Sequence, residues 1–203
     1  MAVVLTSTFA LLARTTSTNT NVKNRIIALN IAREGIEAVR SIRDTNWLKY
    51  SGDRRNKWLC LDSEVGLLSD IDCTDHGDKI SEGLYAIDFS EAAGRYFLKQ
   101  EVFNTDENNI ISASTVKANS ADFDVYRLYQ DATTNKLTHI ESGNQATPFY
   151  RQIELVPNKT QNCGSLECND ITEMSVIVRV FWLEEETGRT LRRLRRTRRR
   201  IRR

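Results

Sequence analysis

Four cysteines are the residues of this 203-residue chain whose type and spacing suggest chemistry most directly. Twelve residues separate Cys60 from Cys73, and four separate Cys163 from Cys168. In a secreted protein this spacing predicts two local disulfides, one within each pair, although the other two connectivities remain open. The alternatives are free thiols or a zinc site, and the long first interval is unusual for structural zinc.

Four aspartates lie close together in the segment DIDCTDHGD, residues 70–78. They provide hard oxygen ligands at short spacing, which is the ligand type that Ca²⁺ prefers. No glutamate follows at the position that an EF-hand loop uses for bidentate coordination, so an acidic surface loop is the alternative. The four candidate ligands are Asp70, Asp72, Asp75 and Asp78.

The two histidines, His76 and His139, lie far apart in the sequence. Neither has a serine or cysteine in a nucleophile motif nearby, and the chain has no glycine-rich phosphate-binding loop. We therefore expect a protein that is not an enzyme and that has no cofactor and no small-molecule substrate.

The C-terminal segment, residues 187–203, is strongly basic. From Gly188 onward it holds ten arginines and no acid, which leaves 19 basic and 27 acidic residues in the rest of the chain. Such a segment would bind a polyanion, such as DNA or an anionic surface, with affinity that falls as salt rises. It could form a basic helix when its charge is neutralised, but it has no aromatic residue to stack on bases. The alternative is a disordered, self-repelling end or a recent frame change with no selected role. The candidate polyanion contacts are Arg192, Arg193, Arg195, Arg196, Arg198, Arg199 and Arg200.

The main secondary-structure signal is an amphipathic helix at residues 25–47, where apolar residues recur at steps of three and four. An uncharged apolar segment, residues 1–13, and a polar join, residues 15–24, precede it. Side chains in the join compete for backbone hydrogen bonds, so we expect it to be flexible, partly melted or a plain loop. The apolar stripe of the helix is marked by Leu29, Ala32, Ile36 and Val39.

From residue 83 onward the apolar period changes to two, which predicts strands. The clearest strand is residues 174–183, with Val176, Val178 and Val180 on one face. A face that uniform must be buried, and the helix at 25–47 is the only long helix available to cover it. The predicted fold is therefore α+β, with one long N-terminal helix packed on an antiparallel sheet. Further strands are predicted at 83–89, 95–103, 125–130, 137–140 and 149–156.

These patterns divide the chain into three parts. They are an N-terminal helix (1–47), a disulfide-containing antiparallel β domain (48–186) and the arginine-rich tail (187–203). No segment reaches the ~20 apolar residues that span a bilayer.

Five segments of the chain form a recognisable series, namely ALNIAREGIEAVRSIRDTNW (28–47), GLYAIDF (83–89), LYQ (128–130), TPFYRQIEL (147–155) and EMSVIVRVFW (173–182). In order and spacing they resemble the type IV pilin-like family, in particular prepilin-type minor pilins and pseudopilins. The resemblance implies a structural subunit of a type IV pilus or a type II secretion-like filament, in the cell envelope or on an extracellular filament. It also implies other pilin-like subunits as partners, and the inner membrane before assembly. The residues expected to pack in the filament are Val3, Val4, Leu5, Phe9, Leu11 and Leu12.

The start of the sequence departs from that family. Family members begin with a basic leader, a prepilin-peptidase cleavage site and an early glutamate in the mature helix, and none of these is present here. We expect either a truncated start or a copy that is not processed. Filament assembly is the favoured function, and polyanion binding through the tail is the alternative.

Overall fold

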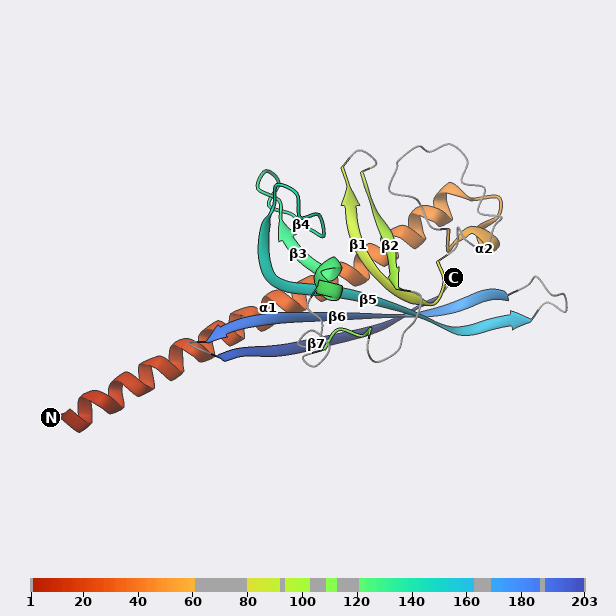
Figure 1. Cartoon of the computed structure of the whole chain (residues 1–203). Helices are drawn as coiled ribbons and strands as arrows, with labels where there is room; N and C mark the ends of the chain where they lie inside the picture. Colours follow the sequence, from red (N-terminus) through yellow and green to blue (C-terminus); the bar gives the residue numbers. More distant parts are fainter. Residues whose placement is uncertain are drawn as a thin grey trace.

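The computed structural model describes residues 2–60, 80–91, 94–102, 109–112, 121–162, 169–186 and 189–202. Within these ranges one long helix lies along one face of a seven-stranded sheet whose paired strands are all antiparallel (Figure 1). The predicted α+β class, with one long N-terminal helix and an antiparallel sheet, is confirmed.

The long helix, α1 (Ala2–Lys49), is continuous from the apolar segment to the amphipathic stripe. The prediction of a flexible or looped join at 15–24 was therefore wrong. Threonines in this stretch donate their hydroxyl hydrogens to the carbonyl one turn earlier, as Thr15 Oγ1 does to Leu11 O at 2.8 Å. These bonds satisfy side chains that would otherwise compete with the helix, so the backbone ladder continues. The other threonines bonded in this way are Thr16, Thr18 and Thr20.

The sheet is organised around the long strand β5. It pairs with β6 along one edge, while β3 and β1 pair with successive parts of β5, so the sheet forks there. A short helix α2 (Arg54–Lys57) and a 3-10 helix η2 (Ala121–Tyr126) complete the described elements. The strands are β1 (Gly83–Ser90), β2 (Arg95–Val102), β3 (Arg127–Gln130), β4 (Leu137–Thr138), β5 (Gln145–Asn162), β6 (Asn169–Glu186) and β7 (Arg189–Arg202).

The strands differ from the sequence-based expectation mainly in their ends. The segment predicted at 125–130 begins within η2 and becomes strand only at residue 127, and the segment at 137–140 shortens to two residues. In contrast, β5 and β6 each reach 18 residues, because they pair with each other far beyond their apolar centres. Pro148 and Pro157 lie inside β5, and the register shifts directly after Pro157, as expected where a residue without an N–H interrupts a ladder.

The arginine-rich tail forms the strand β7, so the predicted end of the β domain at residue 186 was wrong. Fourteen positions of β7 are in register with β6, from Arg189 opposite Glu186 to Arg202 opposite Glu173. Neither a disordered end nor a basic helix forms in the described part of the tail. The reason is that β6 offers a full ladder of backbone donors and acceptors, which a strand can pair with and a helix cannot.

The main core lies between α1 and the sheet. Leu29 is an exception among the predicted core residues, because it is only half-buried and does not belong to the core cluster. Ala28 and Ile31 are buried in its place. Adjacent helix positions differ by about 100° around the axis, so a small rotation of the contact face removes Leu29 from it. The other six predicted residues lie in the core: Ala32, Ile36, Val39, Val176, Val178 and Val180.

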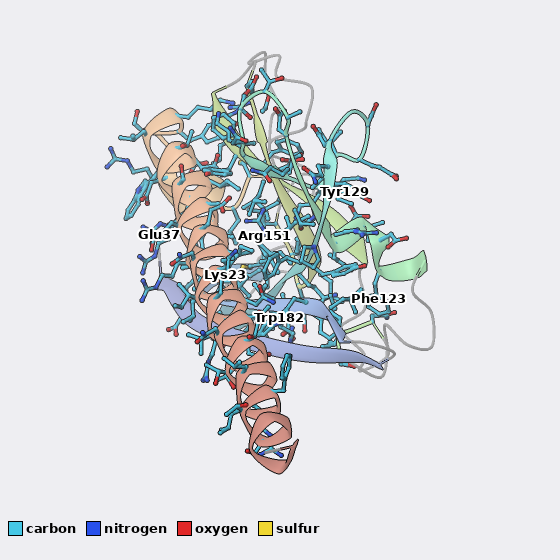
Figure 2. The ribbon with its side chains drawn as sticks, turned by 90° about the vertical axis from the view of Figure 1, so that its left-hand side faces the viewer. Lys23, Glu37, Phe123, Tyr129, Arg151 and Trp182 are labelled. Carbon is cyan, nitrogen blue, oxygen red and sulfur yellow. The ribbon has the colours of Figure 1, made fainter. Side chains whose placement is uncertain are left out.

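Gly35 allows α1 to approach the sheet closely. A Cβ at this position would lie 3.2 Å from Val178 Cγ1 and 3.4 Å from Arg151 Cδ. Figure 2 shows Arg151 between the helix and the strands. Its Nη2 donates to Ile87 O at 2.9 Å, and its Nη1 lies 3.2 Å from Glu34 Oε1 on α1. The helix is therefore held by a close backbone approach and by an ion pair beside it.

We predict that Gly35→Leu lowers the free energy of unfolding by about 1–3 kcal/mol, because the new side chain must displace Val178 and Arg151. Ser41→Leu is the matched control, since position 41 is exposed on the same helix. Substitutions at exposed positions usually change stability by ~0.5 kcal/mol or less. Urea unfolding followed by circular dichroism measures both variants, and equal stabilities would contradict the close approach.

Candidate functional site

The first half of α1 extends beyond the sheet and carries exposed apolar side chains. Figure 1 shows its first turns running past the ends of β6 and β7. Phe9 is 74% exposed, and Leu11 and Leu12 are each 64% exposed. Val22 and Ile26, closer to the sheet, are 52% and 54% exposed. We refer to these five residues as the exposed apolar surface.

No helix in the described ranges is both long enough and apolar enough to cross a bilayer. The polar threonines and asparagines between residues 15 and 24 interrupt the apolar character of α1.

Further along α1, the face turned away from the sheet is charged. Arg40 Nη1 lies 2.9 Å from Glu37 Oε1, and Arg43 Nη2 lies 2.6 Å from Asp44 Oδ1. Figure 2 shows Glu37 on the far side of α1 from Arg151. The side chains of Glu37 and Asp44 are 61% and 55% exposed, so each pair contributes at most about 1 kcal/mol. These charges remain accessible to a second molecule.

The two residues of the ion pair beneath α1, Arg151 and Glu34, differ in burial. Arg151 is 1% exposed, whereas the Glu34 side chain is 36% exposed. Among the described residues Arg151 Nε has no hydrogen-bond partner, and the guanidinium contacts Glu34 and the Ile87 carbonyl. A buried guanidinium loses most of its hydration, so removing the carboxylate of Glu34 is costly. Glu34 thus holds α1 at one register on β5.

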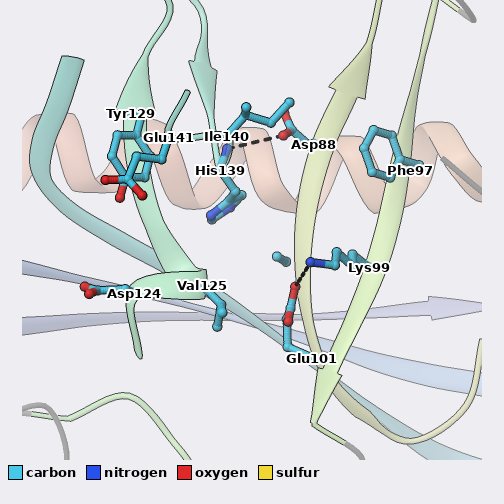
Figure 3. A pocket seen from close by; sticks show the side chains of 11 residues that line it. Asp88, Phe97, Lys99, Glu101, Asp124, Val125, Tyr129, His139, Ile140 and Glu141 are labelled. Carbon is cyan, nitrogen blue, oxygen red and sulfur yellow. Dashed lines mark hydrogen bonds and ion pairs between the residues drawn. The ribbon is translucent and has the colours of Figure 1, made fainter. Parts of the chain in front are cut away.

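A hollow of about 320 Å³ lies at the fork of the sheet, between β3 and the pair β1–β2 (Figure 3). Several of its polar groups bond to one another. Asp88 Oδ2 accepts hydrogen bonds from Thr138 Oγ1 at 2.8 Å and from the backbone N of His139 at 3.3 Å. Lys99 Nζ lies 3.2 Å from Glu101 Oε1. Asp88 therefore ties β4 to β1 across the fork.

His139 is a partly buried, neutral ring in this hollow. Its Nδ1 lies 3.0 Å from the Arg127 carbonyl oxygen, which can only accept, so the proton sits on Nδ1. Its Nε2 is buried, and none of the described residues provides a hydrogen-bond partner for it. Burial, followed by the charges of Arg151 and Lys99, lowers the pKa of His139 to about 3. A ring with that pKa is a weak base at neutral pH, which suits a structural role better than proton transfer.

Many residues singled out from the sequence fall outside the described ranges. All four candidate calcium ligands (Asp70, Asp72, Asp75 and Asp78) lie there, as do Cys73, Cys163 and Cys168. Cys60 is 2% exposed and disulfide-bonded, but its partner is outside the description, so the pairing stays a prediction. Among the described residues, no group of three or more His, Cys, Asp or Glu side chains could hold a metal ion.

The remaining predicted contacts are placed only by their backbone. Val3, Val4 and Leu5 belong to the first turns of α1. The seven candidate arginines belong to β7 and so form one edge strand rather than a free tail. Of the six residues expected to pack in a filament, the side chains of Phe9, Leu11 and Leu12 are described, and all three are exposed.

The sequence analysis did not identify the polar groups that hold α1 on the sheet and that join β4 to β1, namely Arg151, Asp88 and Thr138. A signal for Arg151 was present, because it lies between Phe149 and Ile153 on the same face of a predicted strand. A charge on a buried face requires a partner, and Glu34 lies on the helix that covers that face. Asp88 and Thr138 are 50 residues apart, and neither carries a local motif that would have found them.

Comparison of the chain with protein-family models, with curated proteins and with solved structures gives no match. The function must therefore be argued from the geometry of the chain itself. Of the features described above, the exposed apolar surface of α1 is the one most in need of a partner, because it leaves large apolar side chains in water.

The burial of His139 predicts a loss of stability in acid. The pKa of His139 in the folded protein lies below the value of 6.5 expected when unfolded, so the unfolded state binds the proton first as pH falls. Above pH 6.5 the ring is neutral in both states, so its burial does not reduce the free energy of unfolding. That free energy falls as the pH drops from 6.5 toward 3. Between pH 7 and pH 5 we expect it to fall by about 2 kcal/mol.

Urea unfolding of the wild type and of His139→Gln at both pH values measures this loss. The variant should show a pH dependence weaker by that amount, and His76→Gln is the control for the other histidine. A wild-type pH dependence that His139→Gln leaves unchanged would show that this ring titrates normally.

Proposed function

We propose that this protein is a structural subunit of a type IV pilus or a type II secretion-like filament, a pilin-like protein that assembles through α1. The observation that carries the proposal is the contrast between the two halves of one continuous helix. One face of the second half is buried on the sheet from Ala28 to Ile42, whereas Phe9, Leu11 and Leu12 project into solvent. The five-segment resemblance to pilin-like proteins supports the same assignment.

The exposed apolar surface supplies the driving force for assembly. Full burial of a leucine-sized or phenylalanine-sized side chain contributes roughly 1.5–3 kcal/mol. Phe9, Leu11 and Leu12 alone can therefore contribute several times the ~1 kcal/mol of an exposed ion pair. The partners are other copies or related subunits whose helices lie beside α1. The proposed location is the cell envelope, with the N-terminal helix held at the inner membrane before assembly.

We predict that Leu11→Ser/Leu12→Ser reduces the assembled fraction of the protein at least tenfold, because the double variant removes more than ~1.4 kcal/mol of apolar burial. Ultracentrifugal pelleting and electron microscopy measure assembly, and circular dichroism checks that the helix is retained. Ile140→Ser is the matched control, since Ile140 is 50% exposed but lies in the β domain. Undiminished assembly of the double variant would remove the basis of the proposal.

Polyanion binding through β7 is the second candidate function, and the register of this strand favours it. Positions 193, 195 and 199 lie opposite Trp182, Val180 and Val176, on the face of the sheet that α1 covers. Positions 196, 198 and 200 lie on the other face. They are spaced two residues apart over about 13 Å of strand, which forms a straight row of arginine positions.

We predict that Arg196→Gln/Arg198→Gln/Arg200→Gln weakens binding to duplex DNA and lowers the slope of log K against log salt by about 2–3. The matched control is Arg193→Gln/Arg195→Gln/Arg199→Gln, which removes the same charge from the face that α1 covers. Fluorescence anisotropy over a salt series measures both variants. If the two variants lose the same affinity, the binding reflects net charge and not the row.

A further inference from the structure

We propose that neighbouring copies of this protein pack with their α1 helices parallel and displaced along the axis by one helical turn, and that alternating charges set this displacement. The inference rests on the proposed filament function and names the register of its helix contact. The residues involved, which we refer to as the charge ladder, are Arg33, Glu37, Arg40 and Asp44.

The charge ladder lies on the face of α1 turned away from the sheet. Its residues follow one another at steps of four, three and four, which keeps them in one row on a helix. Arg33 is exposed, and the side chains of Glu37, Arg40 and Asp44 are 61%, 31% and 55% exposed. The sign of the charge alternates at every step, so the row has a period of about two turns.

In a parallel copy without axial displacement, each charged residue would lie beside the same residue of the other copy, so like charges would be adjacent. A displacement of four residues, about 6 Å, removes this repulsion. Arg33 of one copy then lies beside Glu37 of the next, and Arg40 lies beside Asp44. In this register the arginines of one copy pair with the acidic residues of the next, so the two copies contribute different residues to the contact.

The same displacement also aligns the apolar parts of the helices. With a shift of four residues, Val22 of one copy lies beside Ile26 of the next, and both are more than half exposed in the single chain. The projecting turns that carry Leu11 and Leu12 run alongside each other as well. Charge pairing and apolar burial therefore favour one and the same parallel register.

An antiparallel copy would also pair opposite charges, with Arg33 opposite Asp44 and Glu37 opposite Arg40. In that arrangement, however, Leu12 of one copy lies far beyond the position of Lys49, where the partner's α1 ends. The exposed apolar surface of both copies would stay in water. Apolar burial outweighs exposed ion pairs, so the parallel arrangement is the one that we infer.

Disulfide trapping between two single-cysteine additions tests the register. A mixture of Ile26→Cys and Asn30→Cys chains should form the mixed disulfide at least about tenfold faster than Asn30→Cys mixed with Trp47→Cys, a pair that an antiparallel contact brings together. All three positions are exposed, and oxidised wild type is the control for the native cysteines. Predominant 30–47 linkage, or predominant 26–26 linkage from axial alignment, would overturn the inference.

Charge reversal tests whether the ladder sets the register. Arg33→Glu/Arg40→Glu gives an all-acidic row, and Glu37→Arg/Asp44→Arg gives an all-basic row. We expect each variant alone to assemble about tenfold less at low salt, and an equimolar mixture to recover wild-type assembly. If the variants assemble normally while Leu11→Ser/Leu12→Ser does not, the filament function stands and the ladder is excluded. If wild-type chains never associate, both proposals fail.

Discussion

The structure depends on one close contact, the approach of α1 to the sheet at Gly35. Glycine at this position brings the helix backbone down onto Val178 and the stem of Arg151. The guanidinium of Arg151 is thereby enclosed, and Glu34, one residue before the glycine, supplies its carboxylate partner. Small apolar side chains alone would permit the helix to slide along the sheet. A buried charge paired with a carboxylate on the helix does not, because a shift of α1 by one turn would move Glu34 away from Arg151.

Fixing the second half of α1 also fixes the direction of the first. A helix of 48 residues is about 72 Å long, and its threonines bond back to the preceding turn rather than breaking it. The exposed apolar surface therefore lies on a continuous helix whose second half is packed in the core. Such preorganisation reduces the conformational entropy that association would otherwise lose. The charges at 33–44 lie on the same rod, so apolar and polar contacts with a neighbour are set by one geometry.

The sequence was sufficient to predict the helix, the buried valine face of β6 and their mutual packing, because apolar periodicity reports directly on burial. It was insufficient where long-range pairing overrides local preference. The threonine-rich join has poor helix propensity, yet it lies between two helical segments and its hydroxyls find carbonyl partners. The arginine tail reads as a solvated end, yet β6 provides fourteen register partners for it. Arg151 could have been identified from its place on an apolar face, whereas Asp88 and Thr138 are joined only by the fold.

The position of the arginine strand bears on how copies can associate. Among the described strands β7 pairs only with β6, and an edge strand is ordinarily a template for pairing with another chain. Nine of the fourteen residues of β7 are arginines, so two such edges repel each other strongly at low salt. Edge-to-edge pairing of copies through β7 is thereby disfavoured. The exposed face of α1 carries no such repulsion, because the signs of its charges alternate and its apolar side chains are uncovered.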